Sequence, residues 1–281
     1  MQTSRRKFIK SGSATAIAIA AIPKISMNAA ETKKIPIGFQ LYTVRGEFSR
    51  NVPGALKKLA QIGYQAVEFW GYGGKAEVYQ HYKAPELRKF LDDSGLKCCG
   101  MHLELAALSD ENVKQTAETN HTLGSPYLNV AMAKENMTSE KGIAELADLL
   151  NRRAAELRPQ NLTVGYHAHG FDFDKIGGRF AWDLLFTRTE PTVNMQMDVG
   201  NCLGGGGDPI AMLKKFPRRT WTIHIKEYKE KTFASPYYKE IFELCENGCD
   251  TKWYIVEMGG LLGNGFDTPQ EALTKLRQAG K

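Results

Sequence analysis

The sequence predicts an α/β protein that folds as one closed barrel of eight parallel strands, each followed by a helix. Two observations lead to this (β/α)8 prediction: β-rich apolar runs recur about every 30 residues, and each run is followed by a stretch with helical periodicity. A doubly wound open sheet is the alternative, but no strand is followed by a G-x-G-x-x-G turn. Barrels of this kind often form a single unit of about 250 residues, which suits a chain of 281.

The eight strands are expected where the apolar runs are rich in β-branched and aromatic residues. In chain order they are Ile35–Thr43, Ala66–Trp70, Lys97–Glu104, Tyr127–Met132, Leu162–His169, Val193–Gly200, Thr220–Glu227 and Trp253–Gly259. No linker, second domain or short-period repeat interrupts the alternation of strands and helices.

The helices are expected between the strands, where apolar residues follow a helical period. They are Val52–Ile62, Pro85–Ser94, Asp110–Leu123, Ser139–Leu157, Ala181–Arg188, Pro209–Phe216, Pro236–Glu246 and Pro269–Ala279. Pro85, Pro209 and Pro269 stand in first turns, where a missing amide proton costs nothing, so Asp208 and Thr268 are the expected N-caps. The glycine run 204–207 is expected to form a flexible loop over the barrel mouth.

The composition is that of a globular protein, with 42% hydrophobic and 24% charged residues. It excludes collagen-like, disordered and polytopic membrane proteins. The net charge is +6, but the basic residues are scattered and several lie near the N-terminus, so we expect no nucleic-acid partner. Cys98 and Cys99 are adjacent in an apolar run, which indicates core residues rather than a redox site.

The first 30 residues have the pattern of a twin-arginine export signal. Residues 4–10 read Ser-Arg-Arg-Lys-Phe-Ile-Lys, and an uncharged stretch from Ser11 to Pro23 follows. This stretch is too short for a stable membrane span, and no A-x-A cleavage triplet follows it. We therefore expect a leader at 1–30, a barrel domain at 31–281 and a periplasmic protein. An untidy basic amphipathic start is the alternative.

Polar residues gather at the expected carboxyl ends of the strands, where a barrel of this type places its active site. They include four of the six histidines and are Glu68, His102, Glu104, His167, His169, Gln196, Asp198, His224, Lys226, Glu227 and Glu257. A lone strand-end histidine can be a hydrogen-bonded core residue, but pairs two residues apart, such as His167 and His169, point the same way. His167, Asp198, His224 and Glu257 come from neighbouring strands, and mixed imidazole and carboxylate ligands suit one divalent ion, Mn, Co, Zn or Mg.

Several of these runs resemble the sugar phosphate isomerase/epimerase family, whose fold is the xylose-isomerase-like TIM barrel. The matching runs are Gly38-Phe-Gln-Leu-Tyr-Thr-Val-Arg45, Val67-Glu68, Val164-Gly-Tyr-His-Ala-His-Gly-Phe-Asp-Phe173, Met197-Asp-Val-Gly-Asn201, Ile223-His-Ile-Lys-Glu227 and Val256-Glu-Met-Gly-Gly260. The resemblance covers the whole chain after the expected leader. It is specific for the superfamily and leaves the substrate open.

The resemblance implies a metal-dependent chemistry in which a proton is removed next to a carbonyl and the ion stabilises the resulting enediolate. Similar proteins hold the ion with Glu, Asp, His and Glu, so Asp198, His224 and Glu257 match three ligands. His167 stands where the epimerases have a glutamate that both binds metal and moves the proton. This departure puts the two-glutamate proton shuttle, and simple epimerisation with it, in doubt.

The roles expected of the site residues follow from their chemistry. Glu257 is expected to be both base and ligand, His167 a ligand or a second acid/base group, and Lys226 and His102 to neutralise oxyanion charge. Glu68, His169, Gln196 and Trp70 are expected to bind the sugar, while Glu104 and Glu227 could form ordinary ion pairs instead. Phe39, Tyr42, Trp70, Tyr72 and Phe171 either stack on a sugar ring or pack in the core and loops.

We therefore expect an isomerase or epimerase that acts on a sugar or keto-sugar. Export favours free sugars and glycosides, because sugar phosphates are mainly intracellular. The same proton abstraction beside a 3-keto group could instead start a β-elimination that cleaves a glycoside, so a lyase is the alternative. A non-catalytic sugar-binding protein also stays open, whereas an apurinic endonuclease would need more zinc ligands than the chain offers. The oligomeric state is left open.

Overall fold

A computed structural model describes residues 34–258 and 266–281. The expected leader, residues 1–30, lies outside the described residues, as does the end of the strand expected at Trp253–Gly259. Residues 33–281 form one compact unit. Within the described residues, no helix is both long enough and apolar enough to span a bilayer.

The core of this unit is a single parallel sheet of eight strands. In chain order the strands are β1 (Ile37–Gln40), β2 (Ala66–Tyr72), β5 (Lys97–Leu103), β6 (Tyr127–Val130), β7 (Thr163–His167), β10 (Asn194–Gln196), β11 (Thr222–Ile225) and β12 (Trp253–Val256). Their order in the sheet is β10-β7-β6-β5-β2-β1-β12-β11. The two outer strands meet through a parallel bridge between Asp198 and His224, and the His224 amide donates to the Met197 carbonyl at 2.8 Å. The sheet is thereby closed into a barrel.

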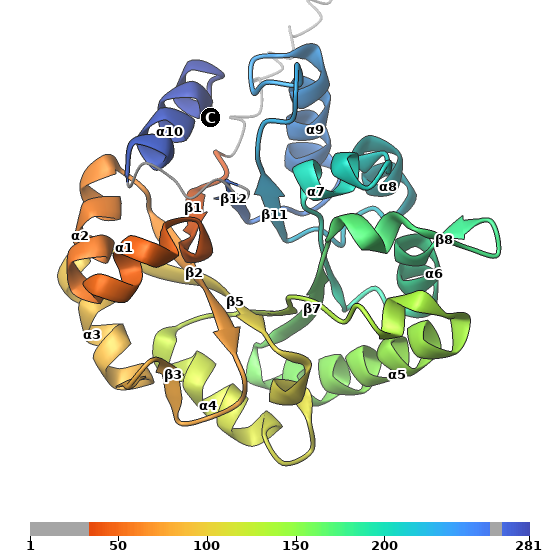
Figure 1. Ribbon diagram of the computed structural model, residues 1–281, viewed down its shortest axis with the longest axis horizontal. Helices are drawn as coiled ribbons and strands as arrows, with labels where there is room; N and C mark the ends of the chain where they lie inside the picture. Colours follow the sequence, from red (N-terminus) through yellow and green to blue (C-terminus); the bar gives the residue numbers. More distant parts are fainter. Residues whose placement is uncertain (1–33, 259–265) are drawn as a thin grey trace, which may run out of the picture. The chain divides into compact units, whose positions relative to one another are not determined.

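Helices surround the barrel (Figure 1). The main ones are α2 (Val52–Ile62), α3 (Ala84–Ser94), α4 (Val113–Leu123), α5 (Glu140–Leu157), α6 (Ala181–Arg188), α8 (Pro209–Lys215), α9 (Pro236–Asn247) and α10 (Asp267–Gln278). All eight expected strands and all eight expected helices are therefore confirmed within a few residues, and with them the (β/α)8 fold.

Shorter elements that we did not predict lie between the barrel strands and the main helices. They are the helices α1 (Arg45–Arg50) and α7 (Val199–Gly204), the 3-10 turns η1 (Leu41–Val44), η2 (Leu105–Leu108), η3 (Asn136–Thr138), η4 (Arg158–Gln160) and η5 (Gly170–Phe173), and two small hairpins, β3 (Glu77–Tyr79) with β4 (Tyr82–Lys83) and β8 (Lys175–Ile176) with β9 (Arg179–Phe180).

The sixth barrel strand is shorter than expected. It was predicted to run to Gly200, but it ends at Gln196, and α7 begins at Val199. The reason is the side chain of Asp198, whose Oδ1 accepts a hydrogen bond from the Asn201 amide at 2.7 Å and so caps the new helix. The glycine run 204–207 therefore joins α7 to α8, and a Cβ at Gly205 would overlap the Gly170 carbonyl oxygen. The expected flexible loop is a close-packed connection.

The two predicted N-caps have different outcomes. Asp208 caps α8 as expected, because its Oδ1 accepts from the Ala211 amide at 3.2 Å. The Thr268 prediction was wrong: α10 starts two residues earlier than expected, at Asp267, and Phe266 is its N-cap without a side-chain hydrogen bond.

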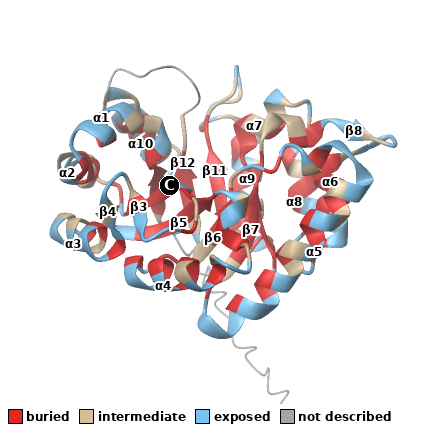
Figure 2. Ribbon diagram, turned by 60° about the horizontal axis from the view of Figure 1, so that its bottom comes forward, coloured by how far each residue is buried: buried red, intermediate tan, exposed pale blue. Residues whose placement is uncertain are grey.

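Burial follows the two-layer plan of a barrel: the strands are buried, and the helices are buried only on the sides that face them (Figure 2). All five cysteines are buried and free, so the predicted core role of Cys98 and Cys99 is confirmed. Inside the barrel, Ala66, Cys99 and Ile255 form a small apolar cluster of their own. Glu68 and Glu257 each lie two residues after a member of this cluster, so by strand alternation they face the interior one layer nearer the carboxyl end.

Candidate active site

The four expected metal ligands converge at the carboxyl end of the barrel. His167 ends β7, Asp198 follows β10, His224 lies in β11 and Glu257 follows β12. One nitrogen or oxygen atom from each lies within 4.8 Å of the corresponding atoms of the others. The side chains of three are almost fully buried, and that of Glu257 is 13% exposed. Adjacent strands thus bring together two imidazoles and two carboxylates.

His224 is held between two carboxylates. Its Nε2 lies 2.6 Å from Glu68 Oε2, and its Nδ1 lies 2.9 Å from Glu257 Oε2. Both carboxylates accept hydrogen bonds, so both ring nitrogens carry protons in this structure. Burial lowers the pKa of His224, but the charges and hydrogen bonds of Glu68 and Glu257 outweigh it and raise the pKa to about 10.

Lys226 supplies a positive charge to the same group. Its Nζ lies 2.8 Å from Asp198 Oδ2 and 3.6 Å from Glu257 Oε2. Gly200 leaves space for the lysine stem, because a Cβ there would lie 2.5 Å from Lys226 Cγ. Burial works against a charged lysine, but the two carboxylates raise its pKa above the usual value. The ammonium therefore stands where a metal ion would also compensate the carboxylates.

Glu68 is fully buried directly beneath this group. Its Oε2 accepts from Gln40 Nε2 at 2.7 Å, and its Oε1 accepts from Gln196 Nε2 at 2.8 Å. Gly100 on the neighbouring strand makes room, because a Cβ there would overlap the Glu68 carboxylate. Burial raises the pKa of Glu68, yet the nearby His102 and His224 lower it overall, so the side chain is a carboxylate.

The hydrogen bonds around Gln196 determine the tautomer of His102. Gln196 Nε2 donates to Glu68 Oε1, which leaves Gln196 Oε1 as an acceptor 2.7 Å from His102 Nε2. His102 Nε2 therefore carries the proton and its Nδ1 keeps a lone pair. Burial is the first cause that lowers the pKa of His102, so the ring is neutral. A neutral imidazole with a free lone pair is suited to accept a proton.

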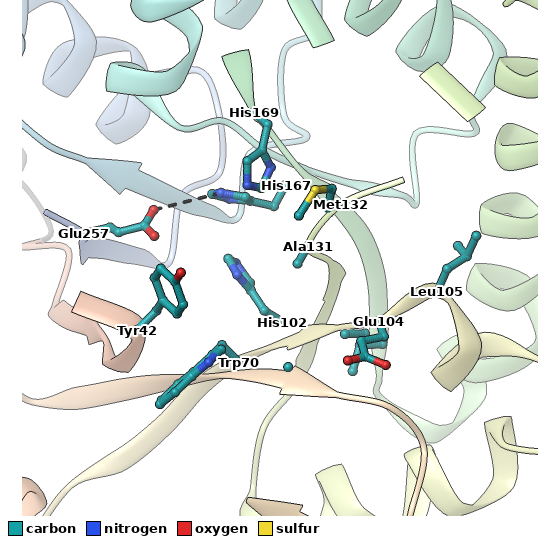
Figure 3. A pocket seen from close by; sticks show the side chains of 12 residues that line it. Tyr42, Trp70, His102, Glu104, Leu105, Ala131, Met132, His167, His169 and Glu257 are labelled. Carbon is teal, nitrogen blue, oxygen red and sulfur yellow. Dashed lines mark ion pairs between the residues drawn. The ribbon is translucent and has the colours of Figure 1, made fainter. Parts of the chain in front are cut away.

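A cavity of about 450 Å³ opens above these residues. His102, His167, His169 and Glu257 contribute polar groups to it, as Figure 3 shows. Apolar and mouth residues complete the lining: Tyr42, Trp70, Gly71, Leu103, Glu104, Leu105, Ala131 and Met132. A volume in the range of about 300–1,000 Å³ with a few convergent polar groups is usual for small-molecule sites.

The structure places the expected site residues at two depths. His102, His167, His169, Glu257 and Trp70 line the cavity. Asp198, His224 and Lys226 lie behind them in the buried group described above.

Glu68 and Gln196 were expected to bind sugar hydroxyls, but the structure places both beneath the cavity. Neither lines it, and both are fully buried. The side-chain amide of Gln196 hydrogen-bonds Glu68, His102 and Thr222. The Thr222 Oγ1 lies 2.9 Å from Gln196 Nε2. Their geometry is that of supports for His102 and His224 rather than of sugar ligands.

The remaining candidates divide in the same way. Glu227 forms the ordinary ion pair expected as an alternative, with Lys275 Nζ at 2.9 Å, whereas Glu104 lines the cavity. Among the aromatic residues, Phe39 and Tyr72 are buried in the core, which is one of the two roles expected for them. Tyr42 and Trp70 line the cavity, and Phe171 stacks on the His169 ring with centroids 5.5 Å apart.

Sequence reasoning missed two supporting residues. Gln40 donates to Glu68, and its polar side chain at the end of an apolar strand was a usable signal. Asp172 is fully buried, accepts from the His169 amide at 2.6 Å and from the Tyr166 hydroxyl at 3.0 Å, and so holds the backbone of the His169 loop. No periodic pattern marks a loop carboxylate of this kind.

The donor set fits a divalent metal ion. His167 Nδ1 is buried without a hydrogen-bond partner. Among the described residues, the cations close to the two carboxylates are the Lys226 ammonium and the His224 ring, whose Nδ1 would have to lose its proton to bind an ion. Metal bonds of about 2.1 Å allow ligand atoms up to about 4.2 Å apart. Small side-chain shifts would therefore suffice to bring the four residues to one ion.

Comparisons with known proteins give the same fold. A family model described as "Xylose isomerase-like TIM barrel" matches residues 56–261. An inosose dehydratase from Geobacillus kaustophilus is 24% identical over 197 residues, which cover 62% of this chain and 61% of that protein. The chain thus spans less than two thirds of the length of the curated relatives it matches.

Two solved structures illustrate the likeness in three dimensions. A sugar phosphate isomerase/epimerase from Parabacteroides distasonis aligns with a TM-score of 0.76 at 21% identity, covering 92% of this chain and all of that one. A 3-keto-D-glucoside 4-epimerase from E. coli aligns with a TM-score of 0.63 at 13% identity, covering 87% of this chain and all of that one. At these identities the two structures establish the fold alone.

Proposed function

The chain belongs to the xylose isomerase-like TIM barrel family, and we propose that it is a divalent-metal-dependent isomerase or epimerase of a sugar or keto-sugar. The observation that carries the proposal is the convergence of His167, Asp198, His224 and Glu257 at the floor of a small-molecule cavity. The relatives support the substrate class, because their names describe sugar epimerases and an inosose dehydratase.

His167, Asp198, His224 and Glu257 would hold the ion. When bound, the ion supplies Lewis-acid stabilisation of negative charge on substrate oxygens. Glu68 accepts from His224 Nε2 and so directs Nδ1 toward Glu257 and the other ligands. A carboxylate that orients a ligating histidine in this way is a common support of metal sites.

Glu257 and His102 are the proposed acid/base groups, and both line the cavity. Burial would raise the pKa of Glu257, but Lys226 and His224 hold it well below its ordinary value, so this side chain is a carboxylate. His102 is neutral, with its lone pair on Nδ1. His169 is also neutral, because burial lowers its pKa to about 4, and it can hydrogen-bond sugar hydroxyls.

A lyase is the second candidate. The proton abstraction next to a carbonyl also begins an elimination, and the dehydratase relative carries a name for that outcome. His167 stands where the epimerases that the sequence resembles have a second glutamate. This replacement favours proton transfer on one face of the substrate only, which suffices for elimination but not for epimerisation. A 3-keto-glycoside would then be cleaved through loss of its aglycone.

We also propose that the protein is exported to the periplasm through residues 1–30. The support is the Arg5-Arg6 pair with the uncharged stretch that follows it. Fractionation of cells that express the full chain and an Arg5→Lys, Arg6→Lys variant tests this. Wild-type protein in the periplasm and retained variant protein are the expected results, and equal distribution of the two would contradict the proposal.

Solvent isotope exchange tests the chemistry directly. The metal-loaded protein is incubated in D2O with ketoses, aldoses and 3-keto-glucosides, and deuterium next to the carbonyl is followed by NMR. Exchange is expected, with a large loss in Glu257→Gln and none in the matched control Glu246→Gln, whose carboxylate pairs with Lys281 away from the site. Bound sugar without any exchange would contradict an enzyme and favour the non-catalytic sugar-binding protein.

A further inference from the structure

The residues that line the cavity indicate which substituent the bound sugar has. We infer that the substrate is an uncharged glycoside with an apolar aglycone that lies against Tyr42, Trp70 and Met132, and that phosphorylated sugars are disfavoured. This inference rests on the proposed function for the position of the sugar ring, at the His and Glu floor. It goes beyond that function by assigning a binding site for the substituent.

Exposed apolar side chains are concentrated at the cavity. Among the described residues, the large hydrophobic side chains that are well exposed are Tyr42, at 44%, and Met132, at 51%. Both line the cavity. Single exposed apolar residues are ordinary, but their gathering at one cavity marks a ligand-binding surface.

The Tyr42 and Trp70 side of the mouth is held in place by aromatic packing. The Tyr42 ring meets Trp70 edge to face, with centroids 5.9 Å apart and an interplanar angle of 74°. Trp70 is supported from behind by Phe48 and Tyr79, at centroid distances of 5.6 and 5.0 Å. Because the rings are already ordered, binding an apolar group there costs little side-chain entropy.

Met132 provides the other side of the mouth. Figure 3 shows it across His102 from Tyr42 and Trp70. Ala131 and the leucines at 103 and 105 extend the apolar lining beside it. A methionine side chain is flexible and polarizable and makes favourable contacts with aromatic groups, so this side can adapt to an aglycone.

The charges of the lining argue against a phosphate group. Among the described lining residues there is no Lys or Arg, and Glu104 adds a carboxylate near the mouth. Three cations lie near the cavity. Lys226 pairs with Asp198 and Glu257, Arg45 lies on the Tyr42 ring with one nitrogen on the Tyr42 carbonyl, and the Lys134 ammonium lies 5.9 Å from the centroid of the Phe171 ring. Phosphates in proteins are normally bound by arginine, lysine or helix N-termini.

A binding comparison tests the inference on the purified full chain. Calorimetry with matched α- and β-glycosides of glucose and galactose compares phenyl with methyl aglycones, and glucose 6-phosphate serves as the charged probe. The phenyl member of at least one pair is expected to bind ten-fold or more tightly than its methyl partner, and the phosphate most weakly. Equal affinities within every pair, no binding of any phenyl glycoside, or tighter binding of the phosphate would each overturn the inference.

Variants locate the effect. Tyr42→Ala and Met132→Ala should remove most of the phenyl preference, whereas Tyr42→Phe, which keeps the ring, should retain it. Glu104→Lys should strengthen binding of glucose 6-phosphate. An unchanged phenyl preference in both alanine variants would overturn the assigned site. Failure of the proposed chemistry is seen separately, as absent isotope exchange with the ketoses, aldoses and 3-keto-glucosides of the exchange experiment.

Discussion

The two ends of the barrel interior are built from the same strands but differ in chemistry. Toward the amino end, Ala66, Cys99 and Ile255 close the interior with small and apolar side chains. One layer further, Glu68 and Glu257 follow on the same strands and belong to a network of carboxylates, imidazoles and a lysine. A period of two along a strand is therefore enough to separate a packing layer from a reactive layer.

The difference shows how buried charge is tolerated in this protein. The buried carboxylates Glu68 and Asp198 each have a partner of opposite charge within hydrogen-bonding distance: Glu68 has His224, and Asp198 has Lys226. Removing one partner from such a pair leaves an uncompensated charge, whereas trimming an apolar side chain leaves only a cavity. We therefore expect a substitution at the carboxyl end to leave a charge without its partner, and a substitution at the amino end to leave a cavity.

The largest expected effect is the loss of the metal ion when a ligand is removed. Asp198→Ala or His224→Ala should abolish binding of added Mn, Co or Zn, because each removes one of four ligands. Calorimetric titration measures this, and circular dichroism should show an intact fold. Unchanged metal affinity in both variants would contradict the site assignment.

At the opposite end, Ile255→Ala should reduce stability without affecting metal binding. The side chain is fully buried, and removing it should cost about 2–5 kcal/mol of unfolding free energy. Urea denaturation checks the loss, and metal titration of the same variant provides the contrast. A weakened metal site in this variant would mean that the two layers are not independent.

Glu68→Gln tests the support of His224 within the reactive layer. The variant keeps the shape but removes the charge that orients His224, so metal affinity should fall by about 10–100-fold. Glu104→Gln is the matched control, since Glu104 lies at the same end of the barrel but contacts none of the four ligands in the described network. Equal affinities in the two variants would show that Glu68 has no supporting role.

The smallest effect is expected outside the barrel. Asp208→Ala removes the side-chain cap of α8 and should cost about 1 kcal/mol of unfolding free energy. Neither metal affinity nor the phenyl preference should change, which thermal denaturation and calorimetry can establish. A loss of metal binding in this variant would indicate that the helices around the barrel affect the geometry of the reactive layer.

The fold could be predicted because its signals are periodic and local. Apolar runs in Ala66–Tyr72 and Trp253–Val256 differ in pattern from the amphipathic helix Val52–Ile62. The helix α7 escaped prediction because two glycines within Val199–Gly204 resemble a loop, although Asp198 three residues before Asn201 has the spacing of a cap.

The candidate site was predictable in its residues but not in their depth. Strand-end position identified Glu68 and Gln196, yet only the barrel register shows that they lie beneath the cavity. Glu68 fits there because Gly100 on the next strand has no side chain, and β2 and β5 shift register beside it. The exposure of Met132 likewise depends on what the neighbouring loops leave uncovered, and no sequence pattern reports this.

The metal content of the protein tests most directly whether the four residues form a metal site. Elemental analysis of the barrel domain, purified without added metal or chelator, counts bound divalent ions per chain. We expect about one equivalent of Mn, Co, Zn or Mg, held by His167, Asp198, His224 and Glu257. No ion, even after reloading with each metal, would contradict the site assignment and would mean that Lys226 and His224 balance the two carboxylates without a metal.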